Sequence, residues 1–146
     1  MGGGDKSRLM LGDRSILSHV IARFEPQCAS LVLNANGDAG RFADLNMPVI
    51  ADRIDGFAGP LSGVLAGLGS AAENGVEYNV TAAADTPLLP CALVPRLQMA
   101  ADDTAHGLAL ATSPSGRQPT FGIWPVALRD DLRTALQEGL RKVVQW

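Results

Sequence analysis

Three glycines followed by a lysine open the sequence and have the composition of a phosphate-binding loop. Gly2, Gly3 and Gly4 would let backbone N–H groups approach a phosphate closely. Lys6 would add a positive charge, which at roughly 4 Å and an effective dielectric constant near 20 contributes about 4 kcal/mol to the interaction with a phosphate. The run does not match the P-loop GxxxxGK[ST], because Asp5 precedes the lysine and no strand leads into it. A glycine-rich terminus that binds no ligand is the alternative.

Three polar residues follow apolar stretches that are typical of buried strands. Asn34 ends the run LVLN, Asp52 follows PVIA, and Asp85 follows NVTAAA. In open α/β sheets, ligands bind at the edge where the strands end, so these side chains would face one crevice. A single carboxylate such as Asp85 suits Mg²⁺, which combines one or two protein carboxylates with substrate phosphates and waters. The alternative is that all three residues form turns, as the sequence Asp-Thr-Pro after the third run also permits.

Other kinds of catalytic site find no support in the sequence. His19 and His106 are far apart and have no partner residue, and GPLSG around Ser62 is not the nucleophile elbow GxSxG. Cys28 and Cys91 are also far apart and do not form a metal-ligand pair. We expect the cysteines to be reduced thiols of a cytoplasmic protein.

The elements that must position the polar residues alternate between strand and helix through residue 100. The apolar spacing predicts helices at 15–24, 39–45, 60–73 and 91–100, and strands at 28–34, 47–52 and 77–85. After residue 100, strands at 107–114 and 119–125 predict an antiparallel hairpin, and an amphipathic helix follows at 126–139. The alternation indicates an α/β fold with a mostly parallel sheet covered on both faces, in a single domain at 1–146.

The composition limits the kinds of partner that this domain is expected to bind. The chain has 146 residues, 47% of them hydrophobic, and a net charge of −3. It therefore has enough apolar residues for a core but no basic field that would attract nucleic acid or an anionic membrane. No apolar run approaches the roughly 20 residues of a membrane span, and the N-terminus has no signal-peptide pattern. We expect neither nucleic acid nor membrane as a partner.

The order of motifs resembles that of molybdenum cofactor guanylyltransferase, the MobA type of nucleotidyltransferase. The resemblance covers essentially the whole chain and is carried by GGGDKS, LVLNAN, VIAD, GPLSGVLAGL, ADTPLLP, RQPTFGIWP and LQEGLRKV. It implies a Rossmann-like three-layer α/β/α domain that joins GMP from GTP to the terminal phosphate of molybdopterin and releases pyrophosphate. The resemblance also implies a requirement for Mg²⁺, and partner proteins that deliver molybdopterin or receive the finished cofactor.

The resemblance assigns roles by matching position. Lys6 would grip the nucleotide phosphates together with the three glycines, and Asn34 and Asp52 would contact the guanosine. Asp85 would hold Mg²⁺ and touch the nucleotide, so that Lys6 and Asp85 are the catalytic residues. The residues expected to receive the pterin partner are Arg117, Gln118, Thr120, Arg141 and Lys142.

The sequence departs from the family at both ends and at one internal position. In the family, a loop of the form LAGGxxxRMGGxDK follows the first strand, whereas this sequence begins at the second methionine of that pattern, and it also stops before the family's closing stretch. We therefore expect the usual first strand to be missing, so that two neighbouring strands have unpaired edges or accept a strand from a partner. Gln118 replaces a histidine, which argues against a proton-dependent role there.

Three interpretations follow from these departures. The sequence is a fragment of a working enzyme, a nucleotide-binding remnant with little catalytic activity, or a related nucleotidyltransferase that uses CTP or another acceptor. Lys6, Asn34, Asp52 and Asp85 are all present, which favours the first interpretation. The choice between GTP and CTP does not follow from the chemistry of these residues alone.

Overall fold

The computed structural model describes residues 5–56 and 59–146. Gly2, Gly3 and Gly4, predicted to bind phosphate, lie outside the described residues. The α-helices are α1 (Ile16–Phe24), α2 (Pro60–Glu73), α3 (Leu93–Asp102) and α4 (Arg129–Gln137). Short 3₁₀ helices are η1 (Lys6–Arg8), η2 (Glu25–Gln27), η3 (Ala39–Leu45), η4 (Val126–Leu128) and η5 (Val143–Gln145). The strands are β1 (Met10–Leu11), β2 (Arg14–Ser15), β3 (Leu33–Asn34), β4 (Val49–Ile50), β5 (Tyr78–Thr81), β6 (Ala109–Ser113) and β7 (Gly116–Pro125).

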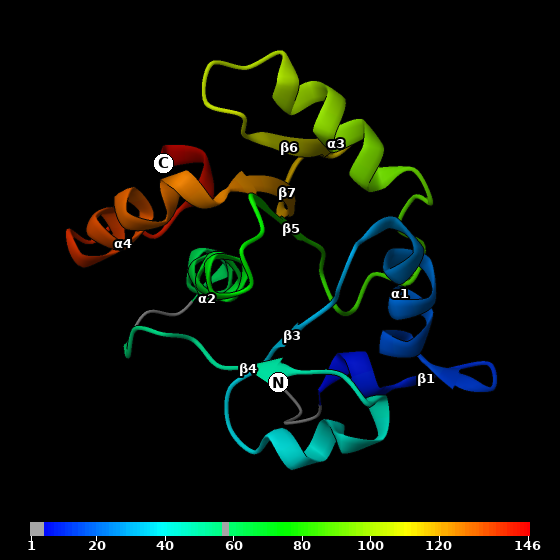
Figure 1. Ribbon diagram of the computed structural model, residues 1–146. Coiled ribbons are helices and arrows are strands. Elements are labelled where there is room, and N and C mark those ends of the chain that lie inside the picture. Colours follow the sequence, from blue (N-terminus) through cyan, green and yellow to red (C-terminus); the bar gives the residue numbers. More distant parts are fainter. Residues whose placement is uncertain (1–4, 57–58) are drawn as a thin grey trace.

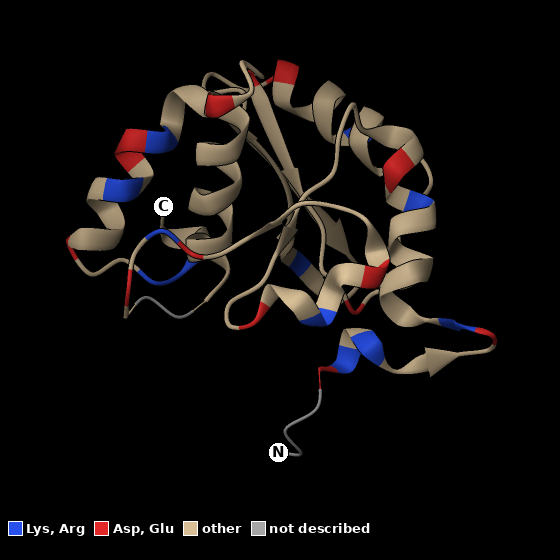
Figure 2. Cartoon of the chain, turned by 60° about the horizontal axis from the view of Figure 1, so that its bottom comes forward, with Lys and Arg blue, Asp and Glu red and all other residues tan. Residues whose placement is uncertain are grey.

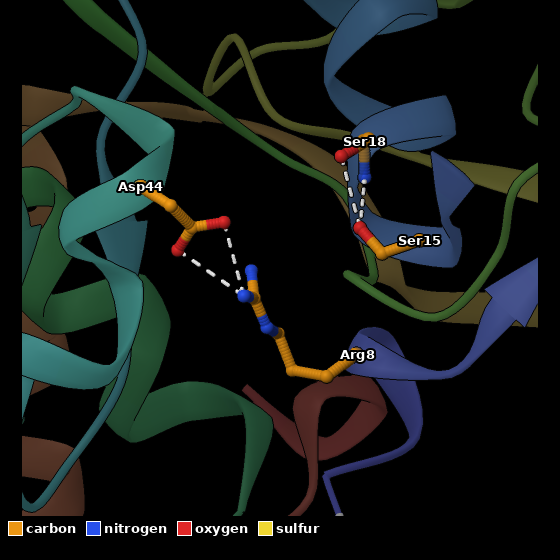
Figure 3. A network of polar contacts seen from close by, with 4 residues as sticks. All are labelled: Arg8, Ser15, Ser18 and Asp44. Atoms are coloured by element: carbon orange, nitrogen blue, oxygen red, sulfur yellow. Dashed lines mark hydrogen bonds and ion pairs between the residues drawn. The ribbon is translucent and has the colours of Figure 1, made fainter. Parts of the chain in front are cut away.

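The predicted helices are confirmed. Ser15 caps α1, since its side chain accepts a hydrogen bond from the backbone N–H of Ser18 at 3.1 Å (Figure 3). Pro95 lies in the first turn of α3, where a helix has backbone N–H groups without intrahelical partners and therefore tolerates proline. The segment predicted as a helix at 39–45 is the 3₁₀ helix η3. None of the helices in the described ranges is long and apolar enough to span a bilayer.

The α/β class and the antiparallel hairpin of β6 and β7 are confirmed, but the parallel part of the sheet is smaller than predicted. In the described residues, only β3 and β4 pair in parallel, over two residues each. The larger sheet is antiparallel, in the order β5-β7-β6. β3 and β4 are short because each has a strand partner on one side only within the described chain, so that no ladder extends them on the other side.

The strand predicted at 77–85 ends earlier than expected. Its pairing with β7 stops at Thr81, opposite Gly122, and Asp85 lies in a turn four residues further along the chain. The backbone of residues 82–84 has no strand beside it in the described chain, so nothing holds it extended. The prediction that Asp85 lies directly at the end of a strand is therefore wrong.

Helices cover both faces of the larger sheet, as Figure 1 shows. One apolar cluster joins α1 and α3 to the face of the sheet that carries Phe121 and Ile123. A second cluster joins α2 and α4 to the opposite face around Trp124, which is fully buried. The indole N–H of Trp124 donates to the hydroxyl of Thr81 at 2.9 Å. The chain thus has the helix–sheet–helix layers of a three-layer α/β fold.

A cleft lies between the parallel pair and the larger sheet. It has a volume of about 700 Å³ and is lined by β3 and the residues before it on one side and by β5 and the residues after it on the other. Helices α1 and α2 close its two faces, with Val20 from α1 and Val64 from α2 among the lining residues. Among the described residues β3 and β5 do not pair, and α1 and α2 both line the cleft between the two sheets.

Candidate functional site

A hydrogen-bonded cluster of three polar side chains forms where β3 and β4 end. The side-chain amide of Asn34 donates to Oδ1 of Asp52 at 3.1 Å and to the carbonyl of Ile50 at 3.2 Å. Asn36 donates to Oδ2 of Asp52 at 3.0 Å, and its own Oδ1 accepts from the backbone N–H of Asp52 at 2.9 Å. The prediction that Asn34 and Asp52 lie together at a strand edge is confirmed.

Asn36 belongs to this site and was missed by the sequence reasoning. It is two residues after Asn34, so a strand-like periodicity places both side chains on the same side of the chain. The repeat in LVLNAN was therefore a signal that could have found it. Asn34 and Asn36 together orient the Asp52 carboxylate and use one lone pair on each of its oxygens.

Helix α2 approaches the cluster closely because it carries a glycine there. A Cβ atom at Gly63 would lie 2.7 Å from Oδ1 of Asn34, so the Asn34 side chain would have to move to admit it. Glycine at this position therefore permits the orientation in which Asn34 contacts Asp52, despite its low helix propensity. The helix begins at Gly59 and Pro60, and Gly59 has a φ of +123° that favours glycine.

A series of contacts through η3 connects the segment of Lys6 to the Asn36 loop. Arg8 forms an ion pair with Asp44 of η3 at 3.0 Å (Figure 3). The guanidinium groups of Arg8 and Arg41 lie 5.8 and 4.7 Å from the ring centre of Phe42, which is buried. Arg41 also donates to the carbonyl of Asn36 at 2.9 Å. The chain of contacts therefore runs from η1 through η3 to the Asn36 loop, and Figure 2 shows the basic residues of η1 and η3 near one another.

Lys6 itself is exposed in the first turn of η1. Asp5 caps this turn by accepting from the backbone N–H of Ser7 at 3.1 Å, and Ser7 is buried. In the described part of the chain, the Lys6 ammonium forms no ion pair. The turn is therefore fixed by its neighbours, while the ammonium group is accessible to a ligand.

Asp85 is also exposed, and its segment shares the cleft with β3. Ala82, Ala83 and Ala84 line the same cleft as Asn34, and Asp85 is the next residue along the chain. The Asp85 carboxylate forms no hydrogen bond or ion pair with another described residue. No group of three or more acidic, histidine or cysteine residues gathers within the described ranges, so a metal ion there would have Asp85 as an isolated carboxylate ligand.

The residues predicted to receive the pterin lie on two separate elements. Arg117 is exposed near the start of β7, and Thr120 further along the strand lines the cleft. The Gln118 amide donates to the hydroxyl of Ser113 at 2.8 Å, which fixes its orientation within the hairpin.

Arg141 and Lys142 are exposed in the segment that follows α4. The Arg141 guanidinium donates to the carbonyls of Leu136 and Leu140. Its own carbonyl is about 4.0 Å from where a Cβ atom of Gly59 would lie, next to the start of α2. These two residues are therefore close to the first turn of α2, whereas Arg117 and Gln118 belong to the hairpin.

Cysteine and histidine chemistry has no place in this site. Burial raises the pKa of the Cys28 thiol to about 11, so this thiol is uncharged at neutral pH and a poor nucleophile. A ring nitrogen of His19 lies 2.7 Å from the carbonyl of Leu11, which ties it to the β1–β2 hairpin.

Comparison with known proteins gives a match over the whole chain. The family model of the MobA-like NTP transferase domain matches residues 1–146. A molybdenum cofactor guanylyltransferase of Nitrobacter hamburgensis is 47% identical over all of this chain and 71% of its own length. The protein of the same name from Bradyrhizobium sp. is 50% identical over all of this chain and 70% of its own. That of Mesorhizobium japonicum is 52% identical over 91% of this chain and 64% of its own.

Solved structures support the fold. The chain is similar to molybdopterin-guanine dinucleotide biosynthesis protein A of Archaeoglobus fulgidus, with a TM-score of 0.72 and 19% identity over 97% of this chain and 70% of that one. A protein of Aquifex aeolicus gives a TM-score of 0.73 at 16% identity, over 89% of this chain and 65% of that one. At these identities the likeness establishes a common fold.

Proposed function

The chain belongs to the family of MobA-like NTP transferase domains, and from this premise we propose that it transfers GMP from GTP to molybdopterin. The reaction would join GMP to the terminal phosphate of the pterin and release pyrophosphate, in the biosynthesis of the molybdenum cofactor. The observation that carries this proposal is the Asn34–Asn36–Asp52 cluster at the ends of β3 and β4, in a chain whose curated relatives bear the name of this activity. The residues at 1–146 would act as one nucleotidyltransferase-like domain.

The cluster supplies hydrogen-bond acceptors for guanosine. Each oxygen of the Asp52 carboxylate accepts one hydrogen bond from an asparagine and retains a lone pair. Guanine carries an amino group on its base-pairing edge next to a ring N–H, so it offers two adjacent donors to one carboxylate. Cytosine offers only its amino group in this way, and GTP is therefore the better match for Asp52.

Lys6 and the glycines before it would bind the triphosphate. The Lys6 ammonium is exposed and is carried by a segment that Arg8 fixes to η3. Two polyanions must come together in this reaction, so a cation that does not engage another side chain can reduce their repulsion and stabilise the departing pyrophosphate. Gly2, Gly3 and Gly4 are included as backbone donors on the strength of the family resemblance.

A general base is not needed for this transfer. The attacking group is a phosphate monoester with a second pKa near 6, so it is largely dianionic at neutral pH. The site would therefore act by neutralising phosphate charge and by holding the two substrates in position. Gln118 is a neutral amide whose nitrogen donates within the hairpin, so it would line the acceptor site without taking a proton.

Mg²⁺ is the metal that fits the carboxylate available. Asp85 is exposed and has no ion-pair partner in the described chain, and Mg²⁺ is commonly bound by one or two carboxylates together with phosphates and waters. When bound, the ion would neutralise charge on the phosphates. Asp85 would hold it at the end of the cleft that begins beside Asn34.

The acceptor would be bound from the two elements that flank this region. We include Arg117, Gln118 and Thr120 on β7, and Arg141 and Lys142 near the start of α2. Proteins that deliver molybdopterin or receive the finished cofactor would approach the same side. A cytoplasmic location is part of the proposal, and the two free cysteines are compatible with a reducing compartment.

A pyrophosphate-release assay with GTP, Mg²⁺ and molybdopterin tests the proposal. We expect release that depends on all three components and is slower with CTP. As a control, Asp52→Asn keeps the shape of the side chain but removes the charge, and should lose the preference for GTP. Binding of GTP without release would identify a nucleotide-binding remnant, and faster release with CTP would contradict the assignment of the base.

A further inference from the structure

The side chain of Asn36 continues the β3–β4 ladder as far as Asp52. The backbone ladder reaches the point where the N–H of Ala35 donates to the carbonyl of Ile50 at 2.9 Å. Beyond it, the N–H of Asp52 donates to Oδ1 of Asn36 at 2.9 Å, so a side-chain amide takes the place of the next ladder carbonyl. The Asn36 amide nitrogen also donates to Oδ2 of Asp52 at 3.0 Å. The position of Asn36 therefore sets both the backbone and the carboxylate of Asp52.

Asn36 itself lies between the end of β3 and the start of η3. Gly37 follows it with a φ of +85°, a conformation that favours glycine and turns the chain toward η3. Asp38 then caps η3 by accepting from the backbone N–H of Gly40 at 2.8 Å. Because Asn36 is outside both elements, a donor from another part of the chain is needed to fix its carbonyl in one position.

Arg41 supplies that donor from η3. Its guanidinium donates to the carbonyl of Asn36 at 2.9 Å. The same group lies 4.7 Å from the ring centre of Phe42, which is only 2% exposed. A cationic donor forms a stronger hydrogen bond than a neutral one, and the face of the ring adds an attraction of its own. Arg41 is therefore anchored on a buried ring and at the same time holds the exposed residue Asn36.

The orientation of the Asp52 carboxylate is more important for guanine than for cytosine. Guanine presents a ring N–H and an amino group side by side, so both carboxylate oxygens must lie close to the plane of the base. Cytosine presents its amino group alone in this way, and it can bond to one oxygen over a wider range of carboxylate rotation. Loss of orientation at Asp52 would therefore weaken the binding of GTP more than that of CTP.

We propose that Arg41 is a positioning residue for base selection, which holds the carbonyl of Asn36 and so keeps the Asp52 carboxylate in the orientation that selects guanine. The inference rests on the proposed function, since it deepens the role given there to Asp52. Arg41 thus has a task different from that of Arg8, although both guanidinium groups lie against Phe42. Arg8 fixes the segment that would bind the triphosphate, which GTP and CTP share.

The test compares the Kd values of GTP and CTP, measured by calorimetric titration with Mg²⁺, in the parent chain and in Arg41→Met. Methionine keeps an unbranched apolar stem beside Phe42 but donates no hydrogen bond. We expect the preference for GTP over CTP to fall about tenfold, the effect of about one hydrogen bond from a charged donor. Arg41→Lys keeps a cationic donor and should retain most of the preference. Arg8→Ala is the matched control, which should weaken both nucleotides alike and leave the ratio of their Kd values unchanged.

A double variant separates a positioning role from direct contact with the nucleotide. If Arg41 acts through Asn36, Asn36→Ala alone should abolish the preference for GTP, and the addition of Arg41→Met should not lower the affinity for GTP further. A further loss in the double variant would show that Arg41 contacts the nucleotide itself, and it would overturn the inference.

Hydrogen exchange gives a readout that needs no nucleotide. The backbone N–H of Asp52 donates to Asn36, so Arg41→Met should speed the exchange of this amide about tenfold, while the ladder amide of Ala35 keeps its protection. Unchanged exchange at Asp52 would overturn the inference, and so would an unchanged ratio of Kd values in a parent chain that prefers GTP. Both results would leave the proposed function in place. A parent chain that binds the two nucleotides equally would contradict the proposed function, and with it the task assigned to Arg41.

Discussion

At the scale of single residues, the site depends on a few groups whose surroundings leave them available to a ligand. The Asp52 carboxylate is oriented by two asparagines but retains lone pairs, and the Lys6 ammonium is exposed on a fixed turn. These groups act by charge and position, so substitutions should affect nucleotide handling more than stability.

Removal of the Lys6 charge is expected to slow the reaction. We predict that Lys6→Ala lowers kcat/KM for GTP on the order of a hundredfold, because one cation that stabilises the phosphates is lost. The measurement is the initial rate of pyrophosphate release, with Arg133→Ala on α4 as a comparison outside the site. An unchanged rate in Lys6→Ala would remove this residue from the mechanism.

A methyl group at Gly63 should disturb the cluster without weakening the fold. Gly63→Ala places a Cβ atom where Oδ1 of Asn34 now lies, so Asn34 must turn away from Asp52. We expect the Kd for GTP to rise about tenfold, while α2 gains up to about 1 kcal/mol of helix propensity. Calorimetric titration and thermal unfolding report the two effects separately.

Gly69→Ala is the matched control for this prediction. Its Cβ atom would meet the side chain of Arg53, which is long enough to move aside. This variant should therefore bind GTP as the parent chain does. Equal loss of affinity in both variants would show that the effect comes from α2 as a whole and not from Asn34.

The raised pKa of Cys28 predicts slow alkylation. Burial favours the neutral thiol in the folded state and raises the pKa to about 11, so at pH 8 the thiolate fraction is about a hundredfold below that of an ordinary cysteine. Exposed Cys91 should react with iodoacetamide first, as peptide mass spectrometry would show.

The pH dependence of stability follows from the same shift. Because the folded state retains the thiol proton above the ordinary pKa of 9.0, Cys28 favours unfolding increasingly as pH rises above about 9. This loss should disappear in Cys28→Ala. Alkylation of Cys28 before Cys91 at pH 8 would contradict the assigned burial.

At the scale of elements, the nucleotide site is assembled by short segments that contact each other through side chains. η1 is held to η3 by Arg8, and η3 is held to the Asn36 loop by Arg41. Helix α2 packs against both sheets. Gly63 leaves room for the side chain of Asn34 from β3, and Gly67, one turn later, leaves room for that of Asn79 from β5.

Loss of the link between η1 and η3 should affect substrate binding. The ion pair of Arg8 with Asp44 is partly exposed, so its own contribution to stability is at most about 1 kcal/mol. We predict that Arg8→Ala raises KM for GTP severalfold with little change in kcat, because Lys6 is no longer held in position. Arg133→Ala, which breaks a comparable ion pair on α4, should leave KM unchanged.

The hydrogen bond between Trp124 and Thr81 should be important for the larger sheet. Thr81→Val keeps the shape of the side chain but leaves the buried indole N–H without a partner, which costs about 1–3 kcal/mol. Urea unfolding followed by tryptophan fluorescence measures the loss. Thr112→Val on β6 is the control, because Thr112 is exposed, and equal destabilisation by both variants would contradict the role given to Trp124.

At the scale of the whole molecule, the sequence predicted the helices better than the sheet. The period of Leu17, Val20 and Phe24 is a local property, and α1 follows it. Strand length depends on partners that lie far away in the sequence. Residues 82–84 are alanines that continue the apolar run, but they have no strand neighbour among the described residues, so the strand that was predicted there ends at Thr81.

The candidate site could also be predicted only in part. Asn34 and Asp52 were found because strand ends are recognisable in sequence, and the structure joins them by a hydrogen bond. The anchoring pair of Arg8 and Asp44 was not found, since the residues are 36 positions apart and neither stands in a motif. The roles of Lys6 and Asp85 as partners on one nucleotide stay a prediction.

The structure of a complex with GTP and Mg²⁺ tests the central claim most directly, namely that one nucleotide is held by groups from η1, from the ends of β3 and β4, and from the turn after β5. We predict the guanine at Asp52, a phosphate within about 4 Å of the Lys6 ammonium, and a metal ion about 2.1 Å from an Asp85 oxygen. A nucleotide bound elsewhere, or one that reaches only Lys6 or only Asp85, would contradict the account.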